Sequence, residues 1–216
     1  MNNLHIATIV IIAANVIVSL KGFEDRSFLE RFKFEIGSIR SGQNERMFTS
    51  GFLHVDYMHL FFNMLTLYFF ADVVIADFGP IKYIGIYVIS LLAGSLLALF
   101  FHRNESYYSA VGASGAVMGI LYAAILLQPE KSIAFIFLPI PIPSYVFGIG
   151  YLLYTIYGMK NRVGNIGHTA HFGGAVGGYV ATLFFKPELF SSDTLMVILL
   201  AIPIIIFVIL QKMGKI

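Results

Sequence analysis

The chain has 216 residues, of which 58% are hydrophobic and only 12% are charged. Its mean hydropathy of +0.81 excludes an ordinary water-soluble globule, because a soluble surface needs far more charge. The net charge of +2 comes without a basic run, so we expect no nucleic-acid partner. The chain has no cysteine, which excludes disulfides and thiolate sites. These features predict a membrane protein.

Seven apolar segments are close to the length that crosses a bilayer, since a hydrocarbon core about 30 Å thick needs roughly 20 helical residues. We predict an all-α, polytopic membrane helix bundle in a single domain over residues 1–216. A six-helix core covers residues 4–186, and a seventh, C-terminal transmembrane helix covers residues 194–211. The first segment lacks a basic n-region and is expected to be a retained helix. The segments are Leu4–Leu20, Leu53–Ala71, Tyr83–Phe101, Ala110–Gln128, Tyr145–Met159, Gly167–Phe185 and Thr194–Leu210.

Two connections stand out from the short links between the other segments. The stretch from Lys21 to Phe52 mixes aromatic residues with charges of both signs, which favours a structured loop at the membrane surface. The sequence FLPIPIPS precedes the fifth segment, and its three prolines exclude a regular helix. We expect an interfacial or re-entrant entry there.

Several polar side chains lie inside the apolar segments, where an unpartnered polar group costs about 2–7 kcal/mol. If every segment crosses once, the second, fourth and sixth run in the same direction and begin at the same membrane face. Ser114 lies near the start of the fourth segment and His171 near the start of the sixth, while His59 and Asn63 lie early in the second. We therefore expect these four side chains to converge at a similar depth.

Glycine spacing predicts which helices approach closely. Gly115 and Gly119 are four residues apart in the fourth segment, and Gly174 and Gly178 repeat that spacing in the sixth. Small residues at this spacing let transmembrane backbones come into contact. His171 shares the helical face of Gly174 and Gly178. The imidazole is therefore expected within hydrogen-bond distance of the serine.

These residue types suit acyl transfer. A neutral histidine accepts the proton of a serine near pH 7, so Ser114 and His171 form a candidate catalytic dyad. The His59 imidazole, the Asn63 amide and the Ser114 backbone N–H are candidate donors to an oxyanion. No Asp or Glu in the segments is evident as a third catalytic member. We expect no cofactor and no metal.

The motifs HVDYMHLFFN, GASG and AHFGGAVGG, in this order, resemble those of the rhomboid family of intramembrane serine proteases. The resemblance covers roughly residues 40–185. It implies that Ser114 is the nucleophile, His171 the general base, and His59 and Asn63 the oxyanion donors. It further implies that the substrates are transmembrane proteins, cut within or near a membrane segment, with small side chains preferred at the cut.

Further residues are expected to support the site, and the family pattern is not matched everywhere. Glu45 stands where a tryptophan often precedes the loop arginine. Met118 replaces an aromatic residue that often packs against the catalytic histidine. These departures affect the packing of the first loop and the orientation of His171. The supporting residues are His54, with a structural hydrogen bond, Arg46, which anchors the first loop, and Gly112 and Gly115 beside the nucleophile.

Access to a site in the bilayer requires a wet cavity, because the hydrogen bonds of a helix shield its peptide bonds. We expect the Pro-rich approach to the fifth segment and the loop Lys160–Gly167 to act as a lateral gate and a cap. The family also implies a cytoplasmic N-terminus and a place in the plasma membrane. The outer side would then carry 11 basic residues against 3 inside, contrary to the positive-inside rule. Six of the 11 lie in the first loop beside five acids, so we keep the family topology.

Three other readings remain open. The first is a rhomboid-fold protein that binds membrane clients without cutting them, which intact Ser114 and His171 disfavour. The second is a small transporter with a histidine proton relay, which should carry paired intramembrane carboxylates. The third is a metal site, built from His54, His59, His168 and His171.

Overall fold

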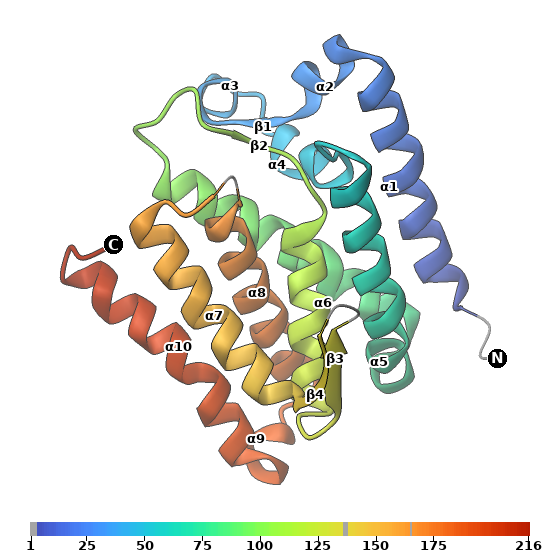
Figure 1. Cartoon of the computed structure of the whole chain (residues 1–216), viewed down its shortest axis with the longest axis vertical. Helices are drawn as coiled ribbons and strands as arrows, with labels where there is room; N and C mark the ends of the chain where they lie inside the picture. The colour runs from blue at the N-terminus through green and yellow to red at the C-terminus, as the bar shows by residue number, and fades with distance from the viewer. Residues whose placement is uncertain (1–3, 136–137, 165) are drawn as a thin grey trace.

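The computed structural model describes residues 4–135, 138–164 and 166–216 and forms a helical bundle (Figure 1). Every predicted apolar segment contains a helix, so the predicted fold class is confirmed, although residues 53–56 and 110–113 precede their helices. The second segment extends beyond Ala71, up to a kink at Gly79. The helices of the bundle are α1 (Ile6–Glu24), α5 (Tyr57–Phe101), α6 (Ser114–Leu127), α7 (Ser144–Asn161), α8 (His168–Phe185) and α10 (Thr194–Lys212).

The helix α5 comprises two predicted segments joined by a sharp kink. Its 45 residues would extend about 68 Å if straight, more than twice the thickness of a hydrocarbon core. Gly79 has φ 76° and ψ 169°, a conformation that only glycine adopts readily. Pro80 follows and suits the first turn of the second half, because it needs no N–H partner there. The chain therefore reverses at Gly79 and crosses twice.

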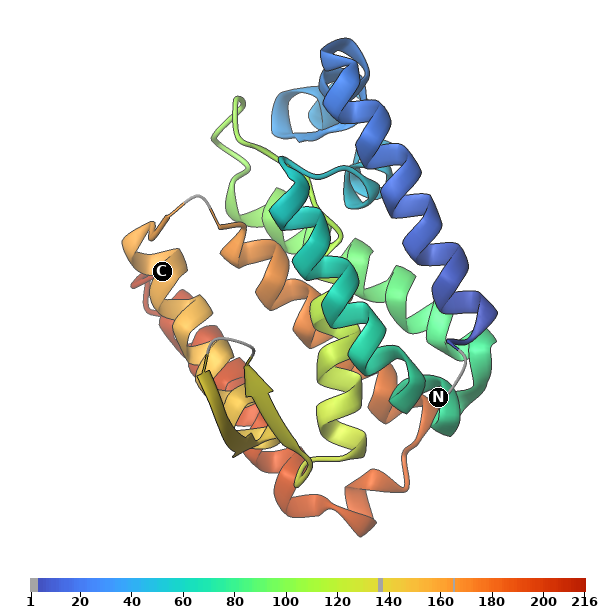
Figure 2. The same ribbon diagram turned by 45° about the vertical axis from the view of Figure 1, so that its right-hand side comes forward.

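The central helix is α6, which lies between α5 and α8 (Figure 2). It is buried on every side, as expected for a helix without a polar face. Its 14 residues rise only about 21 Å, which is less than the hydrocarbon thickness. If its C-terminal end reaches one membrane face, its N-terminal end stops below the other. That end carries Ser114.

Three helices are long and apolar enough to cross a membrane by themselves among the described residues: α1, α5 and α10. The polar residues of α8 face inward instead; His168, Thr169 and Thr182 are buried in the bundle. The chain is therefore an integral membrane protein with several spanning helices. The helices α5, α6 and α8 begin on the same side of the bundle, uppermost in Figure 1, as the crossing argument requires.

The first loop is structured, as its sequence predicts. The buried Arg46 holds the loop together: its Nε donates to the Gln43 side chain at 2.8 Å, and its Nη1 donates to the carbonyls of Glu30 and Lys33 at 2.9 and 3.0 Å. The loop contains α2 (Arg26–Phe32), β1 (Phe34–Glu35), α3 (Ile36–Arg40), α4 (Arg46–Thr49) and a 3₁₀ turn (Ser50–Phe52).

Two short antiparallel strand pairs join the loops. The strand β1 pairs with β2 (Ser109–Ala110) and so ties the first loop to the chain that enters α6. The Pro-rich stretch forms a hairpin of β3 (Ser132–Phe135) and β4 (Leu138–Pro143), and the described residues of this stretch contain no helix. Prolines lack the N–H that a helix or an interior strand needs, but an edge strand tolerates them. Phe137, within the predicted stretch, lies outside the described residues, and α9 (Leu189–Ser192) links α8 to α10.

Candidate active site

Ser114 and His171 meet at the N-terminal ends of two neighbouring helices. Ser114 is the first residue of α6, and His171 lies in the first turn of α8. The Nε2 atom of His171 is 2.7 Å from the Oγ atom of Ser114. The two side chains are therefore hydrogen-bonded across a helix interface, as the nucleophile and base of acyl transfer need.

Glycines permit this approach. A β carbon on Gly174 would overlap the backbone of Gly115, and one on Gly178 would overlap that of Gly119. The other glycine face of α8 lies against α5, where a β carbon on Gly173 would come within 2.7 Å of the Ala93 carbonyl oxygen. Both faces of α8 consist of small residues, so α8 packs closely against two helices at once.

A cavity of about 690 Å³ surrounds the pair and is lined by His59, Gly112, Ser114, Tyr151 and His171, among others. Gly112 has φ 139°, and a β carbon there would come within 2.7 Å of the His59 imidazole. Only glycine suits this position, on both conformational and steric grounds. The chain thus leaves open space directly in front of the Ser114 hydroxyl.

Donors of hydrogen bonds lie at the rim of this space. Ser114 opens α6, where the first N–H groups of the helix have no helical partner, and no side chain among the described residues caps that end. The positive end of the helix dipole lies at the same point. His59 lines the cavity, and its Nδ1 atom is buried without a hydrogen bond among the described residues.

Asn63 is buried one turn after His59, and its amide makes no hydrogen bond to Ser114. Its Nδ2 atom donates to the backbone carbonyl of His59 at 3.0 Å, within its own helix. Serving as an oxyanion donor would require the amide to give up this bond. Of the two predicted donor side chains, the structure brings His59 to the cavity and holds Asn63 behind it.

His54 connects three parts of the chain around the nucleophile. Its Nδ1 atom lies 2.8 Å from the Ser19 hydroxyl of α1, and that hydroxyl donates to the Phe52 carbonyl. Its Nε2 atom accepts the N–H of Ala113 at 3.4 Å. This acceptor role fixes the proton on Nδ1. His54 is fully buried and holds the residue directly before Ser114, which fits a structural role.

The aromatic partner of His171 was not identified from the sequence. Met118, one turn after Ser114, stands where an aromatic residue often packs against the histidine, and it lines a different cavity. Tyr151 of α7 is the aromatic partner instead, and its hydroxyl oxygen lies 2.7 Å from the Nδ1 atom of His171. The sequence offers no signal for it, because α7 also contains Tyr145, Tyr154 and Tyr157.

His168 makes a hydrogen bond to the backbone. Its Nε2 atom donates to the Val163 carbonyl at 3.0 Å, between the start of α8 and the loop before it. Among the described residues, no three His, Cys, Asp or Glu side chains are grouped to hold a metal ion. Asn165, within the predicted cap loop, lies outside the described residues.

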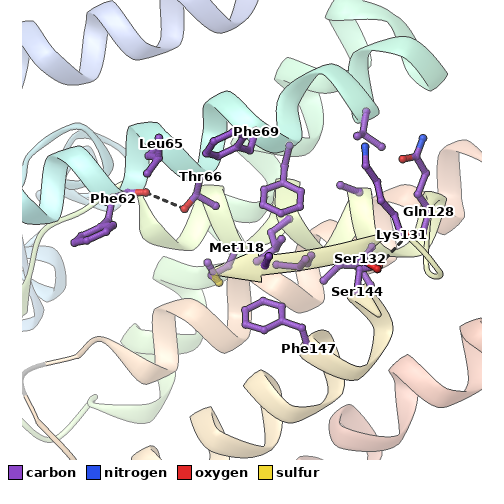
Figure 3. A pocket seen from close by; sticks show the side chains of 17 residues that line it. Phe62, Leu65, Thr66, Phe69, Met118, Gln128, Lys131, Ser132, Ser144 and Phe147 are labelled. Carbon is purple, nitrogen blue, oxygen red and sulfur yellow. Dashed lines mark hydrogen bonds between the residues drawn. The ribbon is translucent and has the colours of Figure 1, made fainter. Parts of the chain in front are cut away.

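A second cavity of about 430 Å³ lies between the first half of α5, α6, α7 and the β3–β4 hairpin. Figure 3 shows Phe62 and Thr66 on one wall, Phe147 on the other, and Met118 between them. Lys131, Ser132 and Ser144 lie at the hairpin end of this cavity. The cavity is lined mainly by apolar side chains and lies between α5 and α7.

A family model, described as the Rhomboid domain, matches residues 41–188, which include both helices of the Ser114–His171 pair. The chain belongs to the rhomboid family. The match also covers the second cavity and the hairpin, and leaves α1 and α10 outside it.

Three curated proteins illustrate the relationship of this rhomboid chain. It is 31% identical to RHOMBOID-like protein 12, mitochondrial, of Arabidopsis thaliana, over 77% of this chain and 54% of that protein. It is 30% identical to Rhomboid protein 1, mitochondrial, of Saccharomyces cerevisiae, over 60% and 38%. It is 29% identical to Rhomboid protease GluP of Bacillus subtilis, over 66% and 26%. The chain spans about half or less of the length of these relatives.

The relatives leave the membrane of residence unassigned. Two of the three are named mitochondrial and the third is bacterial, so they do not support the plasma membrane predicted above. The chain is an integral membrane protein of the rhomboid family.

Proposed function

We propose that this rhomboid protein is an intramembrane serine endopeptidase that uses Ser114 and His171. The observation that carries the proposal is the 2.7 Å contact between Ser114 Oγ and His171 Nε2, inside a cavity of about 690 Å³. A hydroxyl becomes a useful nucleophile only when a base takes its proton, and a neutral imidazole is suited to this near pH 7. The family membership and the name of one relative, a rhomboid protease, support the same reaction class.

The reaction proceeds through an acyl-enzyme. Ser114 Oγ attacks the carbonyl carbon of the substrate while its proton passes to His171 Nε2. The resulting imidazolium returns that proton to the leaving amine, and water, activated by the same imidazole, then hydrolyses the ester. The Ser114 N–H at the open end of α6 and the His59 imidazole stabilise the oxyanion. Asn63 contributes once its amide leaves the His59 carbonyl.

The substrates are transmembrane segments of other proteins, and they enter between α5 and α7. The 430 Å³ cavity between these helices is lined mainly by apolar side chains, which match those of a membrane segment. A helical segment must unwind before its peptide bond is exposed, and small residues at the cut favour unwinding. The family topology puts the N-terminus in the cytoplasm and the catalytic cavity on the opposite face.

Cleavage of a model transmembrane substrate by the purified protein tests the proposal. Ser114→Ala and His171→Ala should each lower the cleavage rate by a factor on the order of 10³ or more, with unchanged thermal unfolding. The matched control is Ser90→Ala, because Ser90 is a buried serine of α5 whose hydroxyl has no partner among the described residues. Cleavage by the Ser114→Ala variant would refute the dyad. A wild-type protein that does not cleave the substrate would favour a client-binding function.

A further inference from the structure

The imidazole of His171 has a second partner besides Ser114. Tyr151 of α7 places its hydroxyl oxygen 2.7 Å from the Nδ1 atom of His171. The two rings lie 6.3 Å apart, centre to centre, with an angle of 26° between their planes. Both ring nitrogens of His171 are therefore engaged, one by α6 and the other by α7.

The direction of each hydrogen bond follows from the role of the base. Nε2 can take the Ser114 proton only if it carries the lone pair, so the proton of the neutral ring must be on Nδ1. The Nδ1–H group then donates to the Tyr151 oxygen. In serine hydrolases with three catalytic members, a carboxylate occupies this place. No Asp or Glu is among the described residues that line the cavity around His171.

The position of Tyr151 is itself fixed by packing. One turn earlier in α7, the Gly148 carbonyl accepts a hydrogen bond from the buried Tyr122 of α6. The Phe147 ring lies 5.7 Å from the Tyr151 ring, on the side of the second cavity. The turn of α7 before Tyr151 is thus bonded to α6, and the Tyr151 ring has an aromatic neighbour in its own helix.

We propose that Tyr151 is the positioning residue of the dyad, a role that rests on the proposed serine protease function. Its hydroxyl oxygen holds the Nδ1–H tautomer and the ring plane of His171. During acylation the Ser114 O–H bond breaks, the proton goes to Nε2, and the new bond joins Oγ to the carbonyl carbon. Tyr151 continues to accept the Nδ1–H bond of the imidazolium and takes no proton itself.

Tyr151→Phe tests this role, because it keeps the ring and its packing and removes only the hydroxyl. We expect kcat for a transmembrane substrate to fall about 10- to 100-fold with KM unchanged, since the tautomer and the imidazolium lose their support. The acid limb of the pH profile of kcat should move to lower pH, because protonation of the ring is less favourable without the acceptor. A merely structural residue would not shift that limb.

The matched control is Tyr179→Phe. Tyr179 of α8 is also buried, and its hydroxyl donates to the Val197 carbonyl at 2.8 Å, far along α8 from His171. This variant should lose thermal stability but keep kcat and the pH profile. An unchanged pH profile and kcat in Tyr151→Phe, or equal losses in both variants, would overturn the positioning role while Ser114→Ala remained inactive. Full cleavage by Ser114→Ala would instead remove the proposed function on which the role rests.

Discussion

Gly174 of α8 and Gly115 of α6 are in backbone contact: a β carbon on Gly174 would lie only 2.8 Å from the Cα atom of Gly115. Gly115 directly follows Ser114, and Gly174 lies three residues after His171. The contact therefore sets the separation of the two catalytic side chains, since each lies within one helical turn of one of these glycines. Close helix packing and the 2.7 Å hydrogen bond are two results of the same interface.

Gly174→Ala should therefore damage both folding and cleavage. The added methyl group overlaps the backbone of Gly115, which no rotamer change relieves. We expect a destabilisation of about 1–3 kcal/mol, typical of overpacking, together with loss of cleavage as Ser114 and His171 separate. Thermal unfolding in detergent and cleavage of a model substrate measure the two effects.

Gly150→Ala is the control for that variant. Gly150 lies in α7, and a β carbon there would meet no atom within 4 Å. Alanine also favours the helix by up to about 1 kcal/mol over glycine. This variant should unfold at the wild-type temperature or above and keep its activity. Equal behaviour of the two variants would show that α6 and α8 can separate without harm to the site.

His54→Ala should lower cleavage although His54 does not touch Ser114. Its imidazole links the Ser19 hydroxyl to the N–H of Ala113, and its loss leaves that buried N–H without a partner. The cost is about 1–3 kcal/mol, and the chain that carries Ser114 loses its anchor. We expect at least a tenfold loss in kcat and a lower unfolding temperature.

Ser19→Ala and the double variant with His54→Ala complete a cycle for that link. Ser19→Ala removes one hydrogen bond from His54 and keeps the bond to Ala113, so its effect should be smaller. The effects of the two substitutions should not add, because both act on the same network. Additive losses would mean that Ser19 and His54 support the site separately.

The sequence was sufficient for the helices and for the Ser114–His171 pair, because hydropathy, the direction of the crossings and glycine spacing mark them. Hydropathy marks each span, and glycine spacing marks the face that carries His171. The end of the second segment is predicted at Ala71, because the charges of Asp72 and Asp77 indicate an early end. In the structure the helix continues past both residues to the kink at Gly79.

Other contacts between distant segments, which no motif or spacing marks, could not be predicted. The pairing of Phe34 with Ala110 depends on how the first loop folds back over α6, which no local pattern encodes. Tyr151 is one of four tyrosines in α7, and only the rotation of that helix selects it as the neighbour of His171. Asn63 shows the reverse case, since its i, i+4 spacing from His59 also suits a bond within one helix.

A cluster beside the loop after α7 predicts a dependence on pH. His102 stacks on Tyr108 at 3.6 Å, and its Nδ1 atom lies 3.1 Å from Glu105, which also faces Arg162 at 3.6 Å. The hydroxyl oxygen of Thr169 in α8 lies 3.4 Å from the Nε2 atom of His102. Burial lowers the pKa of His102, although Glu105 partly opposes this effect. His102 is therefore neutral in the folded loop at neutral pH.

The direction of the pH effect on the stability of this loop follows from proton binding by His102. Below the ordinary histidine pKa of about 6.5 the unfolded loop binds a proton that the folded loop does not. The stability of the folded loop therefore decreases as the pH is lowered, until the pH reaches the lower pKa of the folded state. Hydrogen exchange of residues 102–113 and 158–164, corrected for intrinsic rates, should be faster at pH 5.5 than at pH 7.5. His102→Gln should remove most of that difference. An equal difference in this variant would assign the effect to another group.

The cavity between α5 and α7 predicts that a bridge across it stops cleavage. The wild type has no cysteine, so Thr66→Cys with Phe147→Cys introduces one reactive pair on opposite walls. A short bifunctional thiol reagent should then abolish the cleavage of a transmembrane substrate that the same variant shows before the reagent is added, because the segment cannot pass between the helices. A small fluorophosphonate should still label Ser114, since it reaches the serine through the larger cavity.

The two readouts distinguish a closed entry from a damaged site. A bridge that pulled α7 away from α8 would break the Tyr151–His171 bond and slow the labelling of Ser114 as well. The control pair is Asp77→Cys with Lys186→Cys. The native side chains form an ion pair of 2.7 Å beyond the C-terminal end of α8, the end that does not carry His171. Bridging that pair joins α5 to the end of α8 without crossing the entry, so cleavage should persist. Substrate cleavage at the wild-type rate by the bridged Thr66/Phe147 variant would contradict entry between α5 and α7.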